Sequence, residues 1–279
     1  MNSQSEIDDQ YDAGRAVPQY PEYLARWRDD SRREREQAAC ELGVAYGSTP
    51  PETLDIFPAD RADAPVHVFF HGGYWRALDA ADFSFVARGL RMLGHTTVVV
   101  NYALCPSVTL AEIVRQARAS VVWVHRNIAR FGGDRDRITV SGHSAGGHLA
   151  MMAVLASWSE HDGLPADLLK AAVSISGLHE LAPLCDSYLQ PVLQLDAQTL
   201  ASCSPMRLVR RLGTPVRIAW GSLESDAFAW QAKSFAAAMQ AVGNSALCQS
   251  IPGAHHFSVL DQYLRPDSDI CRWLAEATH

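Results

Sequence analysis

The stretch RITVSGHSAGGHLA at residues 137–150 decides the fold that we expect for this chain. A β-branched segment leads into GHSAG at 142–146, and a run of small and apolar residues typical of a helix follows. A G-x-S-x-G pattern between a strand and a helix predicts a strained turn that presents a nucleophilic serine. Glycines are required on both sides because a Cβ there would collide with the adjacent strand or helix. We therefore expect Ser144 to be a nucleophile at the carboxyl end of a sheet, where the following helix favours a developing oxyanion.

Apolar runs of strand length alternate with helical patterns on both sides of this stretch. We expect strands at residues 66–70, 97–100, 138–140, 172–175, 216–220 and about 246–251, and helices at 110–131, 144–158 and about 258–277. Strands that are buried on both faces and separated by helices indicate a mostly parallel sheet with right-handed crossovers. The chain is therefore predicted to be an α/β protein with helices on both faces of the sheet.

Two segments outside this alternation are expected to form a small cap over the site. Residues 1–20 look irregular, and 21–40 has the apolar spacing of a helix whose other faces carry many charges. The 181–203 segment follows a strand and shows no clear period. We therefore divide the chain into an N-terminal arm, residues 1–40, which is part of the cap, and a catalytic domain, residues 41–279.

A second glycine motif is expected to complement the serine. The segment HGGYW at residues 71–75 directly follows the first of these parallel strands. Paired glycines let the backbone approach closely, and the loop at this place donates N–H groups to an oxyanion when a G-x-S-x-G serine follows. We expect Gly72 and Gly73 to form the oxyanion hole together with the N–H of Ala145.

The general base and its acid are expected after the last two strands, since such a triad runs serine, acid, histidine along the chain. His255 and His256 follow the last strand, and we favour His256 because it directly precedes an apolar helix start. The loop after strand 216–220 offers Glu224 and Asp226; we favour Glu224, which comes first, with Asp226 as the alternative. Either carboxylate would fix the imidazole tautomer without itself taking the proton.

Composition limits the partners of the chain. Its 279 residues are 48% hydrophobic, and the formal net charge of -7 argues against nucleic acid or an anionic membrane as the main partner. The polar start MNSQSEIDDQ has no signal-peptide pattern, and no apolar run approaches the ~20 residues of a membrane helix. Six scattered cysteines are typical of reduced thiols, so we expect a cytoplasmic protein. No metal-binding motif is present, and neither a metal nor another cofactor is expected.

These motifs together resemble the kynurenine formamidase (arylformamidase) branch of the α/β hydrolases. The similarity rests on HGGYW, GHSAGGHLA, SISGLHEL, GSLESDAF and HHF, together with YGSTPPETLDIFPA before the first motif, and it extends from about residue 46 to 264. HGGYW is the most distinctive part, since related esterases more often carry a third glycine or an alanine after HGG. The resemblance implies the α/β-hydrolase fold and a triad of Ser144, Glu224 and His256. This chain has Glu224 where the family often has aspartate, which keeps Asp226 open as the acid.

The resemblance also implies a substrate. N-formyl-L-kynurenine would transfer its formyl group to the serine and release a planar aromatic amine, which calls for a broad apolar subsite. The residues that we expect to line it are Tyr74, Trp75, Tyr188 and Phe228. Arg76 is the nearest cation in sequence for a kynurenine carboxylate.

Three functions compete on this reading. The first is a formamidase, and the second is a carboxylesterase that acts on short acyl or aryl esters with the same machinery. The third is a non-catalytic relative that serves as a binding protein, but such proteins usually lose a triad member, and all three candidates survive here. The partner is therefore expected to be a small-molecule substrate, and a homodimer is an open possibility.

Overall fold

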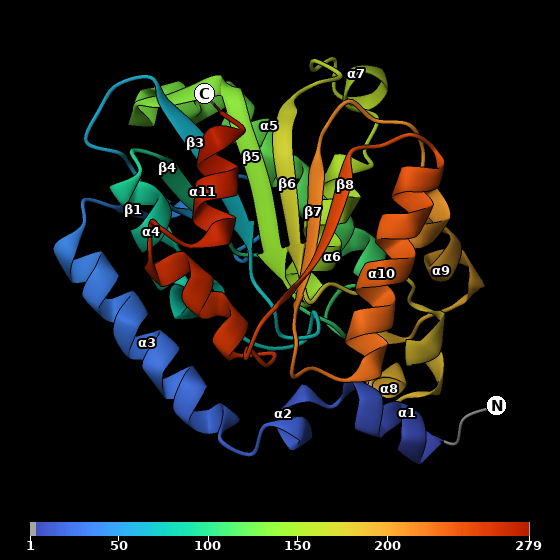
Figure 1. Cartoon of the computed structure of the whole chain (residues 1–279). Helices are drawn as coiled ribbons and strands as arrows, with labels where there is room; N and C mark the ends of the chain where they lie inside the picture. The colour runs from blue at the N-terminus through green and yellow to red at the C-terminus, as the bar shows by residue number, and fades with distance from the viewer. Residues whose placement is uncertain (1–3, 279) are drawn as a thin grey trace.

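The structure, a computed structural model, describes residues 4–278 and is built around one eight-stranded sheet (Figure 1). The strands are β1 (Glu41–Ala45), β2 (Thr53–Phe57), β3 (Ala64–Phe70), β4 (Thr96–Val100), β5 (Gly133–His143), β6 (Leu169–Ile175), β7 (Val216–Gly221) and β8 (Ala246–Ile251). Their order in the sheet is β1-β2-β4-β3-β5-β6-β7-β8. All neighbours from β4 to β8 are parallel, whereas β1 and β2 pair antiparallel at one edge. The predicted α/β fold is confirmed.

Helices cover both faces of this sheet. The α-helices are α1 (Gln4–Tyr11), α2 (Ala13–Ala16), α3 (Tyr20–Gln37), α4 (Ala87–Met92), α5 (Leu110–Asn127), α6 (Ala145–Val154), α7 (Trp158–His161), α8 (Gln190–Leu193), α9 (Ala197–Cys203), α10 (Asp226–Ala241) and α11 (Asp269–Glu276). Short 3₁₀ turns lie between them at Ala80–Asp82, Ser84–Val86, Ile128–Phe131, Ala182–Asp186, Pro205–Leu208 and Ser258–Leu264. None of the helices within residues 4–278 has the length and apolar character needed to cross a membrane.

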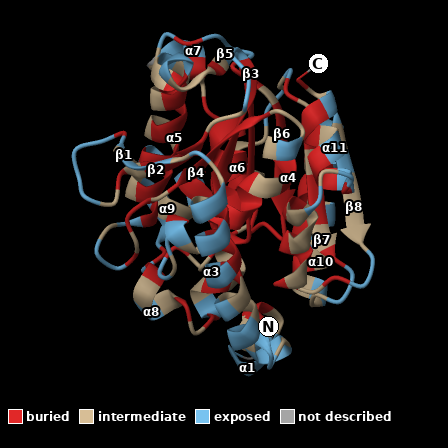
Figure 2. Cartoon of the chain, turned by 90° about the vertical axis from the view of Figure 1, so that its left-hand side faces the viewer, coloured by how far each residue is buried: buried red, intermediate tan, exposed pale blue. Residues whose placement is uncertain are grey.

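Two apolar cores hold these layers together. One lies between the sheet and α5, α6 and α10, and the other lies beneath α3, α4 and α11. Every residue of β3, β4 and α6 is buried, and Figure 2 shows buried positions filling the centre of the molecule. Strands covered on both sides carry continuous apolar runs instead of alternation, which is why these segments are recognisable in the sequence.

The N-terminal region differs from the expectation. Residues 4–16 are helical in α1 and α2, so the prediction of an irregular start is wrong for this part, and residues 1–3 lie outside the described chain. The Asp12 side chain accepts a hydrogen bond from the Arg15 N–H and so caps α2. The predicted helix at 21–40 is α3, which ends earlier, at Gln37.

Three further differences have local causes. Strands β1 and β2 were not predicted: β1 is a largely exposed edge strand without an apolar pattern, and Asp55 interrupts the short apolar run of the buried β2. The helix expected at 144–158 ends at Val154, and α7 follows as a separate turn. The helix expected at 258–277 is interrupted between Leu264 and Asp269, where Pro266 cannot continue an α-helix.

The parallel register brings the site-bearing loops to one edge of the sheet. Phe70 of β3 pairs with Gly142 of β5, and Gly142 pairs with Ser174 of β6. Gly221 and Ile251 are partners at the ends of β7 and β8. The loops that leave these strands therefore begin side by side, at the edge where ligands bind in α/β sheets.

Candidate active site

The turn between β5 and α6 has the strained geometry of a nucleophile elbow. Ser144 has φ 56° and ψ -118°, values that side chains rarely adopt, and its N–H donates to the Ile175 carbonyl at 2.8 Å. A Cβ on Gly142 would lie 2.0 Å from the Gly146 carbonyl oxygen, and one on Gly146 would lie 1.9 Å from the Phe70 carbonyl oxygen. Both positions therefore require glycine, which gives a physical reason for the sequence motif.

Ser144 lines a cavity of about 250 Å³ at the carboxyl edge of the sheet. The side chain is buried, and its Oγ has no hydrogen-bond partner within the described chain. The serine also stands at the N-cap position of α6, so the positive end of that helix faces the reacting centre. His256 lines the same cavity.

His256 faces a carboxylate from the neighbouring loop. Its Nδ1 lies 3.6 Å from Oε2 of Glu224, and both side chains are almost completely buried. The other carboxylate oxygen, Oε1, accepts hydrogen bonds from Ser176 Oγ at 2.5 Å and from the Gly221 N–H at 3.2 Å. These two donors hold one edge of the carboxylate, so the other edge is turned toward the imidazole. A carboxylate in this position stabilises a positive charge on the imidazole.

Asp226 lies elsewhere. It is the first residue of α10 and borders a different, outward-facing hollow with Pro183 and Trp230. The structure thus brings Glu224, and not Asp226, next to His256. The other histidine of the pair, His255, contacts the hydroxyl of Tyr23 through Nε2 at 3.1 Å.

The HGG segment lies against the elbow. A Cβ on Gly72 would come within 3.4 Å of the Ser144 Cβ and 3.0 Å of the His143 Nδ1, so the Gly72 backbone passes directly beside the nucleophile. Gly73 has φ 115°, and a Cβ there would lie 2.1 Å from the Ala77 carbonyl oxygen. Only glycine allows this path of the backbone at residue 73, and both Gly72 and Gly73 line the cavity.

The loop after β4, which contains Tyr102, packs against the HGG segment. The Tyr102 hydroxyl donates to the His71 carbonyl at 2.6 Å, and the two rings stack with centroids 4.1 Å apart. Burial lowers the pKa of His71 to about 4, so this stacked ring is neutral at pH 7. The HGG segment is therefore supported by the stacked rings of His71 and Tyr102.

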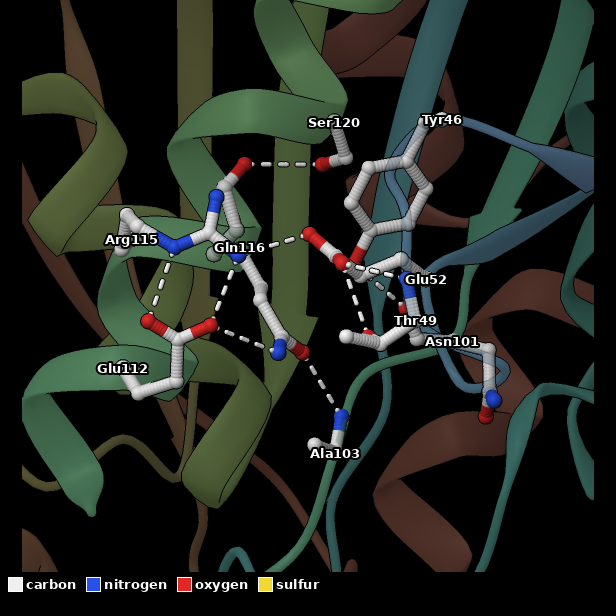
Figure 3. A network of polar contacts seen from close by, with 10 residues as sticks. Tyr46, Thr49, Glu52, Asn101, Ala103, Glu112, Arg115, Gln116 and Ser120 are labelled. Atoms are coloured by element: carbon white, nitrogen blue, oxygen red, sulfur yellow. Dashed lines mark hydrogen bonds and ion pairs between the residues drawn. The ribbon is translucent and has the colours of Figure 1, made fainter. Parts of the chain in front are cut away.

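A polar network anchors that supporting loop to α5 (Figure 3). Gln116 accepts a hydrogen bond from the Ala103 N–H at 2.8 Å, and Arg115 pairs with the buried carboxylate of Glu52 at 2.7 Å. The Tyr46 hydroxyl donates to the Asn101 carbonyl at 2.9 Å. The network connects the β1–β2 edge and the loop after β4 to one helix, α5. It therefore holds in place the loop that contacts the HGG segment.

A further histidine steadies His256. His143, the variable residue of the G-x-S-x-G motif, donates from Nε2 to the His256 carbonyl at 2.8 Å, and the two rings lie 4.6 Å apart. Burial lowers the pKa of His143 well below its usual value, which keeps this ring neutral. His143 therefore positions the backbone of His256 without adding a charge beside it.

The expected aromatic lining is found only in part. Tyr74 and Tyr188 line the cavity, as does Arg76, whose guanidinium carbon lies 5.4 Å from the centroid of the Tyr188 ring. Trp75 does not: the positive φ angles of Tyr74 and Trp75 turn its ring into the core, where it packs edge-on against His148. For Trp75 the expectation of a lining role needs correction, because the turn reverses the direction of the side chain.

Phe228 packs against the imidazole of His256. Its ring lies 4.7 Å from that of His256 and 6.0 Å from that of Tyr11. It borders a narrow space between Glu224 and the N-terminal arm and is not among the residues that line the main cavity. In place of the expected substrate contact, Phe228 therefore makes a packing contact with His256.

Sequence reasoning missed much of the cavity wall. Asp12, Ala13 and Gly14 of the arm line it, as do Tyr20, Leu24 and Trp27 of α3. The Tyr74 hydroxyl donates to the Tyr11 carbonyl, which ties the arm to the oxyanion loop. The available signal was the apolar stripe of α3; nothing in residues 4–16 taken alone indicates a place beside the serine. Within residues 4–278 no group of acidic, histidine and cysteine side chains could hold a metal ion.

A buried serine on a strained strand-to-helix turn, beside a histidine that faces a carboxylate, defines a hydrolase site at the edge of a parallel sheet. Comparison with known proteins agrees: the chain belongs to the alpha/beta hydrolase fold family, whose model matches residues 67–260.

Curated relatives extend over most of the chain. Kynurenine formamidase of Danio rerio is 27% identical over 93% of this chain and 91% of its own length, and that of Salmo salar is 28% identical over 90% and 86%. Esterase LipC of Mycobacterium tuberculosis is 29% identical over 78% of this chain and 60% of its own length. Among solved structures, a candidate thioesterase from a Silicibacter species superposes with a TM-score of 0.86 at 28% identity, covering 96% of this chain and 98% of that one.

Proposed function

We propose that this protein hydrolyses an aryl formamide such as N-formyl-L-kynurenine, releasing kynurenine and formate. The observation that carries the proposal is the meeting of Ser144 and His256 in one cavity, with Glu224 Oε2 3.6 Å from the imidazole Nδ1. The kynurenine formamidases to which the chain is similar over about nine tenths of its length favour this substrate class.

The proposed reaction begins with attack by the serine. Ser144 Oγ forms a bond to the formyl carbon while His256 takes its proton, and the imidazolium is stabilised by Glu224. The negative oxygen would be held by backbone N–H groups of Gly72 or Gly73 and of Ala145; the close approach of Gly72 to Ser144 and the start of α6 at Ala145 support this assignment. When the carbon–nitrogen bond breaks, His256 returns its proton to the departing aromatic amine.

The second half regenerates the enzyme. Water gives a proton to His256 and attacks the formyl ester of Ser144; the serine leaves with that proton, and formate is released. The formyl group is a single carbon, so it needs little room beside the buried serine. The aromatic amine would lie against Tyr74 and Tyr188, which line the cavity.

A carboxylesterase remains the second candidate, because the same groups would hydrolyse an ester and esterase LipC is among the relatives. We also propose that the N-terminal arm and the 181–203 segment form the cap over the site, since the arm lines the cavity and the Tyr188 N–H donates to Asp8 at 2.7 Å. A cytoplasmic location and a homodimer stay predictions from the sequence.

The test compares kcat/KM for N-formyl-L-kynurenine and for p-nitrophenyl acetate in the wild type and in Ser144→Ala. We expect the formamide to be preferred by several orders of magnitude, and the substitution to lower kcat for both substrates by about 10⁶-fold. The exposed Ser245→Ala is the matched control and should change neither value. Ester turnover without formamide hydrolysis would move the function to the esterase, and full activity of Ser144→Ala would end the serine mechanism.

A further inference from the structure

The cavity at the active site contains one acidic and one basic side chain in an otherwise mostly aromatic and small-residue wall. Among its lining residues in the described chain, Asp12 and Arg76 alone carry a formal charge at neutral pH, apart from the histidines of the site. Asp12 comes from the N-terminal arm, and Arg76 directly follows the HGGYW segment. Pockets for small molecules typically use a few such polar groups to orient the ligand.

These two charges do not neutralise each other. No ion pair within 4.0 Å involves either side chain within residues 4–278, and the guanidinium N–H groups of Arg76 donate to no protein acceptor in the described chain. Asp12 accepts a hydrogen bond from the Arg15 N–H through Oδ1 at 2.9 Å, which leaves Oδ2 available. A guanidinium and a carboxylate oxygen thus retain binding capacity on the wall of one cavity.

Both charged side chains lie near the same residue, Tyr188. The Arg76 guanidinium carbon lies 5.4 Å from the centroid of this ring. Burial, with a smaller contribution from Asp12, raises the pKa of Tyr188 to about 12, whereas Arg76 acts to lower it, so both charges act on the same phenol. The Tyr188 N–H donates to Asp8, four residues before Asp12, which fixes the arm against this part of the wall.

We propose that Asp12 and Arg76 bind, respectively, the ammonium and carboxylate groups of an α-amino acid carried by the substrate. The inference rests on the proposed function and narrows it: the substrates are aryl formamides with a zwitterionic amino acid side chain, as in N-formyl-L-kynurenine. Arginine suits a carboxylate through parallel N–H donors, and a carboxylate oxygen is a strong acceptor for an ammonium group.

The pair of charges acts in binding and not in bond cleavage. The amino acid group of such a substrate keeps its charges throughout the reaction, so contacts to it are equally strong in the ground state and the transition state. Their loss should therefore raise KM and leave kcat nearly unchanged. A residue needed only to hold the arm would affect substrates with and without the amino acid group alike.

The experiment uses the full chain and three formamides. The first is N-formyl-L-kynurenine, the second is its analogue without the amino group, 4-(2-formamidophenyl)-4-oxobutanoate, and the third is N-(2-acetylphenyl)formamide, which lacks the whole amino acid group. The variants are Asp12→Asn and Arg76→Gln. Asparagine caps a helix as well as aspartate, so the first variant removes the charge and keeps α2 capped.

We expect Asp12→Asn to lower kcat/KM about tenfold for N-formyl-L-kynurenine only. Arg76→Gln should lower it about tenfold for the two substrates that carry a carboxylate, with partial recovery in Arg76→Lys. The acetylphenyl formamide should be unaffected in both. Asp9→Asn and Arg15→Gln, which break an exposed ion pair on the same arm, are the controls and should leave all three values unchanged.

Equal losses on all three formamides would overturn the proposal, as would no loss on any of them. Failure of the proposed function is distinguishable, because the wild type would then hydrolyse none of the formamides. In that case L-kynurenine is measured as a competitive inhibitor of p-nitrophenyl acetate hydrolysis. Inhibition that Asp12→Asn and Arg76→Gln weaken about tenfold would support the amino acid site, and unchanged inhibition constants would refute it.

Discussion

The nucleophile elbow (residues 137–150) and the first part of the N-terminal arm (residues 4–16) line the same cavity, but different forces hold them. The elbow is held by sterics: its glycines face backbone atoms about 2 Å from where a Cβ would stand, and every residue of α6 is buried. Residues 4–16 are held by polar and aromatic contacts to distant segments, such as the Tyr188 to Asp8 hydrogen bond and the edge-on contact of the Tyr11 and Phe228 rings.

This difference suggests a division of roles, in which the elbow positions the reacting group and the arm contributes to substrate binding. Steric contacts of the backbone hold Ser144 in one position. The reaction requires this, because its rate depends on placing the reacting atoms to within fractions of an ångström. The arm brings Asp12, Ala13 and Gly14 to the cavity through contacts that are individually worth about 1 kcal/mol. A change in the arm can therefore alter which substrate binds while leaving the reacting groups in place.

Gly146→Ala should give the largest effect, because it breaks the elbow itself. The added Cβ would lie 1.9 Å from the Phe70 carbonyl oxygen, and backbone on both sides leaves no room to shift. We expect a loss above about 4 kcal/mol in the free energy of unfolding, or no folded protein. Urea denaturation measures it. Gly213→Ala, with nothing within 4 Å of its Cβ, is the control and should lie within about 0.5 kcal/mol of the wild type.

Glu224→Gln should come next and should spare the fold. The amide keeps the size of the carboxylate but loses the charge that faces His256 Nδ1, so kcat should fall by about 10³- to 10⁴-fold. Asp226→Asn, on the first turn of α10, should change kcat less than threefold. Steady-state kinetics with either the formamide or the ester measures both losses of kcat. A larger loss in Asp226→Asn than in Glu224→Gln would make Asp226 the acid.

Acid should destabilise the core, where neutral histidines surround the elbow. Burial lowers the pKa values of His71 and His148 to about 4, whereas an unfolded histidine titrates near 6.5. Between these values the unfolded chain binds protons that the folded chain does not, so stability falls as pH drops from about 6.5 toward 4. Each group contributes at most about 1.4 kcal/mol per pH unit.

Urea midpoints at pH 7, 6 and 5 measure this loss, and His148→Gln should make the decline shallower. A midpoint that rises on acidification would contradict the assignment of these rings as neutral.

Gln10→Ala should give the smallest effect and act only on the arm. The Gln10 side chain accepts from the Ala227 N–H at 3.0 Å, at the start of α10, and its loss should weaken docking of the arm by about 1 kcal/mol. Hydrogen exchange of residues 4–16 should rise about fivefold, and KM should increase with little change in kcat. Gln4→Ala, at the far end of α1, is the control. An equal fall in kcat would show that the arm also positions the triad.

Much of this fold could be predicted because its signals are local. The buried strands β3, β4 and β6 appear in the sequence as continuous apolar runs, and the elbow appears as glycines at fixed offsets from Ser144. The edge strand β1 could not be predicted, since it is mostly exposed and owes its extended form to pairing with β2.

The site divides in the same way. The order of motifs along the chain was enough to nominate Ser144, Glu224 and His256, because parallel strands deliver the loops after them to one edge of the sheet. Which carboxylate faces the imidazole depended on the turn after β7, where the Gly221 N–H and Ser176 Oγ hold Glu224 in place. The sequence of a loop does not show in which direction the side chains of neighbouring residues point.

By itself, the sequence determined the sheet, the elbow and the family of reactions, because backbone sterics and burial act between neighbouring residues and leave periodic or fixed-spacing marks. Only the tertiary structure decided that the Trp75 ring turns into the core and that Asp12 lines the cavity without an ion pair to any side chain within residues 4–278. Both depend on contacts between segments far apart in the chain, such as that of Tyr74 with Tyr11, and those contacts exist only after the sheet has brought the segments together.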